Sequence, residues 1–197
     1  MALPAHHPIA GLDGPSPWVQ RWSHLVPAQG PVLDVACGHG RHARWFAARG
    51  HPVTAVDRSA DALASLGSLP GVQCVQADIE GTPWPLPLEG GIQEFAGVVV
   101  TNYLWRALFD TLRASVGPGG VLIYETFAQG NETVGKPSRP DFLLAPGELL
   151  HLCRGWRVIA YEDGYLAHPE RFVQRIVAVR PTPPTLSTET SPARYQL

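Results

Sequence analysis

The stretch from Val32 to Gly40, Val-Leu-Asp-Val-Ala-Cys-Gly-His-Gly, constrains the fold of this chain more than any other. An apolar run carrying one acid, Asp34, is followed by Gly38 and Gly40 and then by a segment, 41–49, with the pattern of a helix. The order predicts a strand, a tight turn and the start of a helix. Glycines in such a turn let backbone N–H groups approach a ligand closely, at a helix end that favours negative charge.

A second acid, Asp57, closes the next apolar run, 52–56, about 20 residues beyond the glycine turn. An acid at this distance is placed to bind the two hydroxyls of a ribose. The two features together predict a cofactor that contains adenosine.

Strand and helix patterns alternate along the rest of the chain. Strands are predicted at 31–36, 52–56, 72–76, 95–101, 120–127, 156–162 and 172–179, and helices at 18–25, 41–49, 60–66, 104–115 and 146–153. This alternation is typical of an α/β protein with a Rossmann-like, doubly wound, mostly parallel sheet. No helix-sized segment separates the last two strands, so we expect them to pair as an antiparallel hairpin at the sheet edge.

The composition indicates one globular domain. Of the 197 residues, 45% are hydrophobic and 16% are charged, which excludes a disordered chain. The domain is predicted to span 18–180, after an irregular lead-in, 1–17, and before a tail, 181–197, whose Pro, Thr and Ser content predicts disorder.

Charge and cysteine content narrow the function classes. The formal net charge is -2, so no basic excess favours nucleic acid, and no apolar run has the length of a membrane span. The N-terminal sequence lacks the pattern of a secretory signal, and three scattered cysteines read as free thiols. We therefore expect a cytoplasmic protein, a monomer or homodimer, without a metal site, since no Cys and His spacing matches zinc.

The glycine turn alone leaves two cofactor classes open. The sequence Gly38-His39-Gly40-Arg41-His42-Ala43 fits the dinucleotide pattern of nicotinamide and flavin enzymes. A carboxylate at the mouth of the turn would repel a pyrophosphate, whereas it suits a ligand with a positive end. If Asp34 faces the ligand, S-adenosylmethionine, with its ammonium and sulfonium groups, is favoured over a dinucleotide.

Five segments, in this order, resemble the motifs of the class I S-adenosylmethionine-dependent methyltransferases. They are Asp34–Gly40, Val56–Ser59, Gln76–Ile79, Thr101–Leu104 and Val116–Leu122. The resemblance covers about residues 30–180 and implies a seven-stranded sheet whose last strand is inserted antiparallel. More narrowly, Arg139–Leu150 and Gly155–Val158 look similar to the small tellurite-resistance-type methyltransferases.

The resemblance also implies roles for individual residues. It places Asp57 at the ribose, Asp78 at the adenine amino group, Ile79 and Arg58 against the adenine ring, and Asn102 and Tyr103 beside the methionine part. The remaining predicted cofactor residues lie in or after the glycine turn: Asp34, Ala36, Gly38, Gly40, Arg41 and His42. Tyr103, Glu125 and His168 are the candidates for a catalytic role.

The predicted reaction is methyl transfer by in-line displacement to a small molecule, such as a thiol or a chalcogen compound. Thr101-Asn102-Tyr103-Leu104 stands where nucleobase amino-methylating enzymes often carry Asp/Asn-Pro-Pro-Tyr, which disfavours that class. Three alternatives stay open: a protein or RNA acceptor, a nicotinamide-dependent oxidoreductase, and a partner subunit that binds the cofactor without catalysis.

Overall fold

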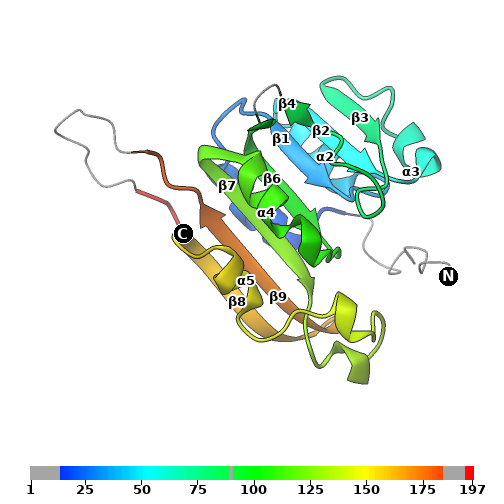
Figure 1. Cartoon of the computed structure of the whole chain (residues 1–197), viewed down its shortest axis with the longest axis vertical. Coiled ribbons are helices and arrows are strands. Elements are labelled where there is room, and N and C mark those ends of the chain that lie inside the picture. The colour runs from blue at the N-terminus through cyan, green and yellow to red at the C-terminus, as the bar shows by residue number, and fades with distance from the viewer. Residues whose placement is uncertain (1–13, 89–90, 184–193) are drawn as a thin grey trace.

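The computed structural model describes residues 14–88, 91–183 and 194–197 and contains a mixed sheet of seven strands. Its strands are β1 (Val32–Val35), β2 (Val53–Asp57), β3 (Val72–Gln76), β6 (Phe95–Thr101), β7 (Val116–Phe127), β8 (Arg157–Ala167) and β9 (Glu170–Val179). The strand order across the sheet is β3-β2-β1-β6-β7-β9-β8 (Figure 1). The predicted strands and the fold class are therefore confirmed.

The first five strands of this order are parallel, and β9 is inserted antiparallel between β7 and β8. The predicted hairpin exists, but it is longer than the sequence pattern indicated, and β8 rather than β9 forms the sheet edge. The inserted antiparallel strand is the arrangement that the methyltransferase resemblance implied. It brings the start of β9 to the edge of the sheet where β6 and β7 end, since Glu125 is the register partner of both Thr101 and Arg175.

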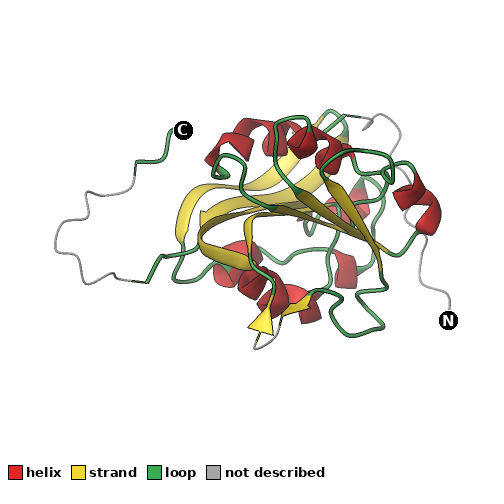
Figure 2. Ribbon diagram, turned by 90° about the horizontal axis from the view of Figure 1, so that it is seen from above, coloured by secondary structure: helices red, strands yellow, loops and turns green. Residues whose placement is uncertain are grey.

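Helices cover both faces of the sheet (Figure 2). One face packs against α1 (Pro17–Trp22), α2 (Arg41–Ala47) and α3 (Ala60–Ala64), with Trp18, Trp22 and Phe46 among the buried side chains. The other packs against α4 (Phe109–Ser115) and α5 (Glu148–Leu152) through Leu112 and Leu149. Parallel strands covered on both faces are apolar along their whole length, as in the run Val98-Val99-Val100.

Several boundaries differ from the sequence prediction. The predicted helix at 18–25 is α1 followed by a 3-10 turn, η1 (Ser23–Leu25), and the one at 104–115 begins as η2 (Arg106–Leu108). A small hairpin of β4 (Pro87–Leu88) and β5 (Gly91–Ile92) was not predicted, because two-residue strands carry no measurable alternation. Two further 3-10 turns, η3 (Asn131–Thr133) and η4 (Pro140–Phe142), lie between β7 and α5.

The ends of the chain are only partly described. The predicted lead-in lies mostly outside the described residues, as does 184–193 of the predicted disordered tail. The last four residues are placed, and Tyr195 packs against the core cluster that contains Trp18 and Trp22. None of the helices in the described ranges has the length and apolar character needed to cross a membrane.

Candidate functional site

In the glycine turn after β1, one glycine borders open space and the other is packed against a side chain. Ala36, Gly38 and Gly40 have φ of 51°, 53° and 72°, in the left-handed region. A Cβ added at Gly38 would meet no atom within 4 Å, whereas one added at Gly40 would overlap the Leu66 side chain. Gly38 is therefore the residue at which backbone stands open to a bound molecule, and Gly40 is a packing requirement.

Asp57 lies at the end of β2 and is joined directly to this turn. Its Oδ2 accepts a hydrogen bond of 2.7 Å from Gly38 N, and its Oδ1 accepts one of 2.9 Å from Ser59 N. Each carboxylate oxygen keeps a further lone pair, so the side chain can still accept from the hydroxyls of a ribose. The acid and the open glycine thus occupy one place at the carboxyl ends of β1 and β2, where such sheets bind ligands.

Asp34, the acid within β1, is bound by the protein itself, and its predicted contact with the cofactor stays a prediction. It is 1% exposed, and its Oδ2 accepts a 3.0 Å hydrogen bond from Ala43 N in the first turn of α2. Burial raises the pKa of Asp34 to about 7, against the lowering effects of the Ala43 hydrogen bond and the Arg41 charge. The acid caps a helix that begins without a side-chain cap of its own. Its charge therefore gives no ground for choosing between the two cofactor classes.

His42 is also bound by the protein itself, and its predicted contact with the cofactor stays a prediction. The ring is 1% exposed, Ser16 N donates to its Nε2 at 3.1 Å, and its Nδ1 lies 3.4 Å from Thr101 Oγ1. Burial, with a smaller effect of the Arg41 charge, lowers the pKa of His42 to about 3. Arg41, one residue earlier, donates to the carbonyl of Gly14 at 3.3 Å. Burial lowers the pKa of its guanidinium against the opposing charges of Glu125 and Asp34.

The residues predicted for the adenine lie beside Asp57. Ala77 N donates to Asp57 O at 3.0 Å, and Asp78 Oδ1 accepts from Glu80 N and Gly81 N at 3.1 and 3.3 Å. Ile79 is buried, whereas Arg58 is exposed. Asp78 therefore shapes its own loop, and its contact with adenine stays a prediction, as do those of Ile79 and Arg58.

Asn102 and Tyr103 follow the end of β6. Asn102 has φ of 53°, and its N–H donates to Glu125 O at 2.9 Å. The hydroxyl of Tyr103 is buried, and its carbonyl accepts from Tyr124 at 2.9 Å. Burial, with smaller effects of the Glu80 charge and of a hydrogen bond to Glu80, raises the pKa of Tyr103, so the phenol stays protonated at neutral pH.

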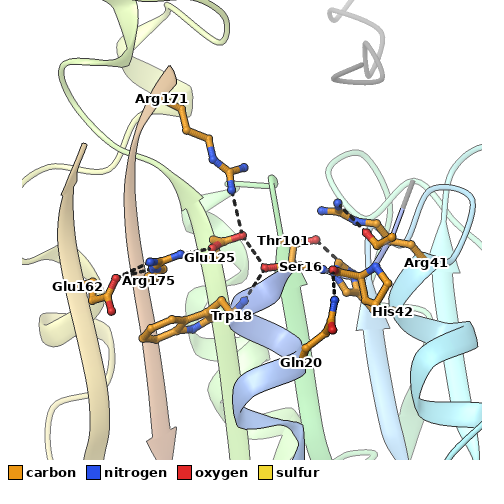
Figure 3. A network of polar contacts seen from close by, with 12 residues as sticks. Ser16, Trp18, Gln20, Arg41, His42, Thr101, Glu125, Glu162, Arg171 and Arg175 are labelled. Atoms are coloured by element: carbon orange, nitrogen blue, oxygen red, sulfur yellow. Dashed lines mark hydrogen bonds and ion pairs between the residues drawn. The ribbon is translucent and has the colours of Figure 1, made fainter. Parts of the chain in front are cut away.

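Glu125, at the end of β7, is the centre of a network drawn from distant parts of the chain (Figure 3). It is 1% exposed; Ser16 Oγ donates to its Oε1 at 2.9 Å, and Arg175 Nη1 donates to its Oε2 at 3.1 Å. Arg171 Nη2 lies 3.9 Å from Oε1. Each carboxylate oxygen thus accepts one hydrogen bond, and the side chain lies beside two arginines of β9. Its catalytic role stays a prediction.

His168, the other candidate for catalysis, is exposed at the turn between β8 and β9. No described contact joins it to the network around Glu125, and its role stays a prediction.

Arg171 is the feature of this region that sequence reasoning missed. It is 6% exposed, and its Nε and Nη1 are buried without a hydrogen-bond partner within the described ranges. A buried donor without a partner costs about 1–3 kcal/mol, and more when it is charged. Two such donors on one buried guanidinium give it the capacity to bind an anion. No sequence signal could have found Arg171, since it lies 46 residues beyond Glu125.

Comparisons with known proteins agree with this arrangement. Residues 32–120 match the family model described as a methyltransferase domain. The malonyl-[acyl-carrier protein] O-methyltransferase of Salmonella typhimurium is 30% identical over 139 residues, which are 66% of this chain and 55% of that protein. The chain spans about half the length of the curated relatives it matches.

Two solved structures share the fold. TehB from Haemophilus influenzae superposes with a TM-score of 0.63 at 17% identity, covering 80% of this chain and 60% of that one. The Burkholderia thailandensis 1,6-didemethyltoxoflavin-N1-methyltransferase, solved with S-adenosylhomocysteine, gives 0.61 at 18% identity and covers 84% of this chain and 77% of that one.

Proposed function

We propose that the chain is a class I S-adenosylmethionine-dependent methyltransferase and that it transfers a methyl group to a small molecule that carries an oxyanion. The observation that carries the proposal is the pairing of two half-sites along one sheet edge. Gly38 and Asp57 form one at the ends of β1 and β2, and Arg171 stands in the other beside the ends of β6 and β7.

The residues present fit the cofactor. The groups that would hold it are the open backbone at Gly38 and the ribose-type acid Asp57, with the buried phenol of Tyr103 at the end of β6. When bound, S-adenosylmethionine supplies a methyl group already activated by the sulfonium. Asp57 would accept from the ribose hydroxyls while keeping the Gly38 and Ser59 N–H groups fixed. The protein's contribution to rate is then alignment and exclusion of water.

The acceptor class follows from Arg171. A buried guanidinium with two free N–H groups favours an anion, and the carboxylate of Glu125 already compensates Arg175. Small chalcogen oxyanions and carboxylates satisfy this requirement. The Salmonella relative is named for a malonyl acceptor, which has a carboxylate. A neutral thiol, by contrast, would leave the Arg171 donors unpaired.

Two measurements test the proposal. Calorimetric titration with S-adenosylmethionine, S-adenosylhomocysteine and the nicotinamide dinucleotides should give micromolar binding of the sulfur nucleotides alone. Asp57→Ala should weaken that binding at least tenfold. Binding of a dinucleotide alone, or unchanged affinity in the variant, would overturn the cofactor assignment.

The acceptor is tested by transfer of labelled methyl to selenite, malonate and small thiols. We expect turnover with an oxyanion, and a KM for it that rises at least tenfold in Arg171→Gln but less in Arg171→Lys. Turnover confined to thiols, or to protein or RNA, would reject the oxyanion and leave the cofactor assignment intact. Binding without turnover of any acceptor would instead favour a partner subunit.

A further inference from the structure

Thr101 is the last residue of β6 and stands between the two half-sites. Its side chain is 9% exposed, and its register partner across the sheet is Glu125, the residue that holds Arg171 and Arg175. The one described hydrogen bond of its hydroxyl joins it to His42 at 3.4 Å (Figure 3). The direction of that bond decides what the hydroxyl can do next.

The tautomer of His42 follows from its other partner. Ser16 N is a backbone donor, so the Nε2 that it contacts at 3.1 Å must be an acceptor without a proton. The ring is neutral at neutral pH because its pKa is lowered to about 3. A neutral ring carries one proton, which therefore resides on Nδ1 and is donated to Thr101 Oγ1.

The hydroxyl of Thr101 is thereby fixed as the acceptor in that bond, and its own proton must go elsewhere. No acceptor for it occurs in the described parts of the chain. Glu125, the nearest carboxylate by strand register, accepts from Ser16 and Arg175, and no hydrogen bond from Thr101 to it occurs in the described residues. A buried hydroxyl whose proton has no partner resembles Arg171, which has free donors in the same network.

We propose that Thr101 determines acceptor specificity: its hydroxyl donates to the same oxyanion that Arg171 binds, and Ser16 and His42 are positioning residues that orient it. This inference rests on the proposed function, because it assumes an oxyanion between β6 and β9. The Thr101 hydroxyl would be a neutral donor, oriented by His42, beside the charged donor Arg171. Such a pair selects groups with at least two oxygen atoms.

The test compares two substitutions of Thr101. Thr101→Val keeps the shape and removes the hydroxyl, whereas Thr101→Ser keeps the hydroxyl and is the matched control. We expect Thr101→Val to raise the KM for selenite or malonate about tenfold and to leave the affinity for S-adenosylhomocysteine within about twofold. Thr101→Ser should stay within about threefold of the parent in both. Equal KM values in parent and Thr101→Val would reject the proposal.

A double-variant cycle locates the effect. If Thr101 and Arg171 bind one group, the KM effects of Thr101→Val and Arg171→Gln should be non-additive, whereas multiplicative effects would reject a shared ligand. Binding of selenite or malonate to the complex with S-adenosylhomocysteine, measured calorimetrically, gives the same comparison without turnover.

A spectroscopic readout is independent of the proposed function. Nitrogen-15 NMR of His42 should report a proton on Nδ1 and none on Nε2, and a proton on Nε2 would overturn the assignment. Failure of the free protein to bind S-adenosylhomocysteine would reject the proposed function instead, and the histidine spectrum separates the two results.

Discussion

Asp34 and His42 are buried ionisable side chains, and burial disfavours the charged form of each. It therefore raises the pKa of Asp34 and lowers the pKa of His42. The pKa of Asp34 rises from 3.8 to about 7, so its stabilising contribution is complete below pH 3.8 and is lost as the pH rises through 7. The pKa of His42 falls from 6.5 to about 3, so its contribution is complete above pH 6.5 and is lost as the pH falls through 3. Between pH 3.8 and 6.5 the folded chain holds a proton on Asp34 that the unfolded chain has lost, and it lacks a proton that the unfolded chain holds on His42. The two contributions to the pH dependence of the free energy of unfolding therefore cancel.

Asp34→Asn should reveal the pH dependence that His42 gives to the free energy of unfolding. The variant keeps an acceptor for Ala43 N but no longer titrates, so its free energy of unfolding should rise with pH, relative to the parent, by up to about 1.4 kcal/mol per pH unit between pH 4.5 and 6. His42→Gln should show the opposite slope. Urea denaturation at several pH values measures both, and profiles parallel to that of the parent would contradict the assignment.

Sequence reasoning located residues whose role is set by their neighbours in the chain, and it failed where a side chain's direction depends on a distant element. Gly38 and Asp57 were predicted from spacing, and the 2.7 Å bond between them fits that reading. Asp34 was identified as an acid of this motif, but only the start of α2 reveals that it points inward to Ala43.

At the scale of elements, the two glycines of the turn between β1 and α2 have different roles: Gly38 borders open space for a ligand, and Gly40 packs against Leu66. Gly38→Ala should cost about 1–2 kcal/mol of stability, the strain of a left-handed residue, and weaken S-adenosylhomocysteine binding at least tenfold, because the new Cβ enters open space. Gly40→Ala should cost more than about 2 kcal/mol, since Leu66, which it would overlap, is fully buried. Urea denaturation and calorimetry measure the two quantities. A larger stability loss in Gly38→Ala than in Gly40→Ala would contradict this division.

The attachment of α1 to the site can be measured with two helix caps. Ser16 caps α1 by accepting from Trp18 N at 3.1 Å and also donates to Glu125, whereas Ser59 caps α3 by accepting from Ala62 N at 3.2 Å and is exposed. Ser59→Ala should lower the free energy of unfolding by about 1 kcal/mol. Ser16→Ala should lower it by about 2–3 kcal/mol, because Glu125 also loses a buried donor. Equal losses in urea denaturation would mean that the Glu125 bond contributes nothing.

At the scale of the whole molecule, the sheet joins parts of the chain that no local pattern connects. Hydrophobic runs sufficed to predict all seven strands, since even the partly exposed edge strands β3 and β8 carry apolar residues. The network around Glu125 could not be predicted, because Ser16, Thr101 and Arg171 meet only through strand order and the insertion of β9. Their residue types are ordinary, and nothing in the sequence distinguishes Arg171 from the exposed arginines.

The end of the chain supplies a last test of this long-range organisation. Tyr195 is partly buried against the cluster that holds Trp18, with the Arg157 guanidinium 5.9 Å from its ring centroid, and the Gln196 carbonyl lies 3.1 Å from His24 Nε2. These contacts lie near the start of β8 and the end of β9, at the edge of the sheet opposite Asp57, because Val179 pairs with Val121 near the beginning of the parallel register. The C-terminal residues should therefore support stability without touching the site.

Tyr195→Ala should lower the free energy of unfolding by about 1–2 kcal/mol, from the loss of partly buried aromatic area. For a chain of this length the melting temperature should fall by about 2–8 °C. Arg194→Ala, at an exposed neighbouring position, is the control and should leave it within about 1 °C. Calorimetric titration with S-adenosylhomocysteine should give the same affinity in both variants, since the altered residues lie at the far edge of the sheet. A weaker affinity in Tyr195→Ala would mean that the loss reaches the cofactor half of the site through the packing of α1 on the sheet and the bond of Ser16 to His42.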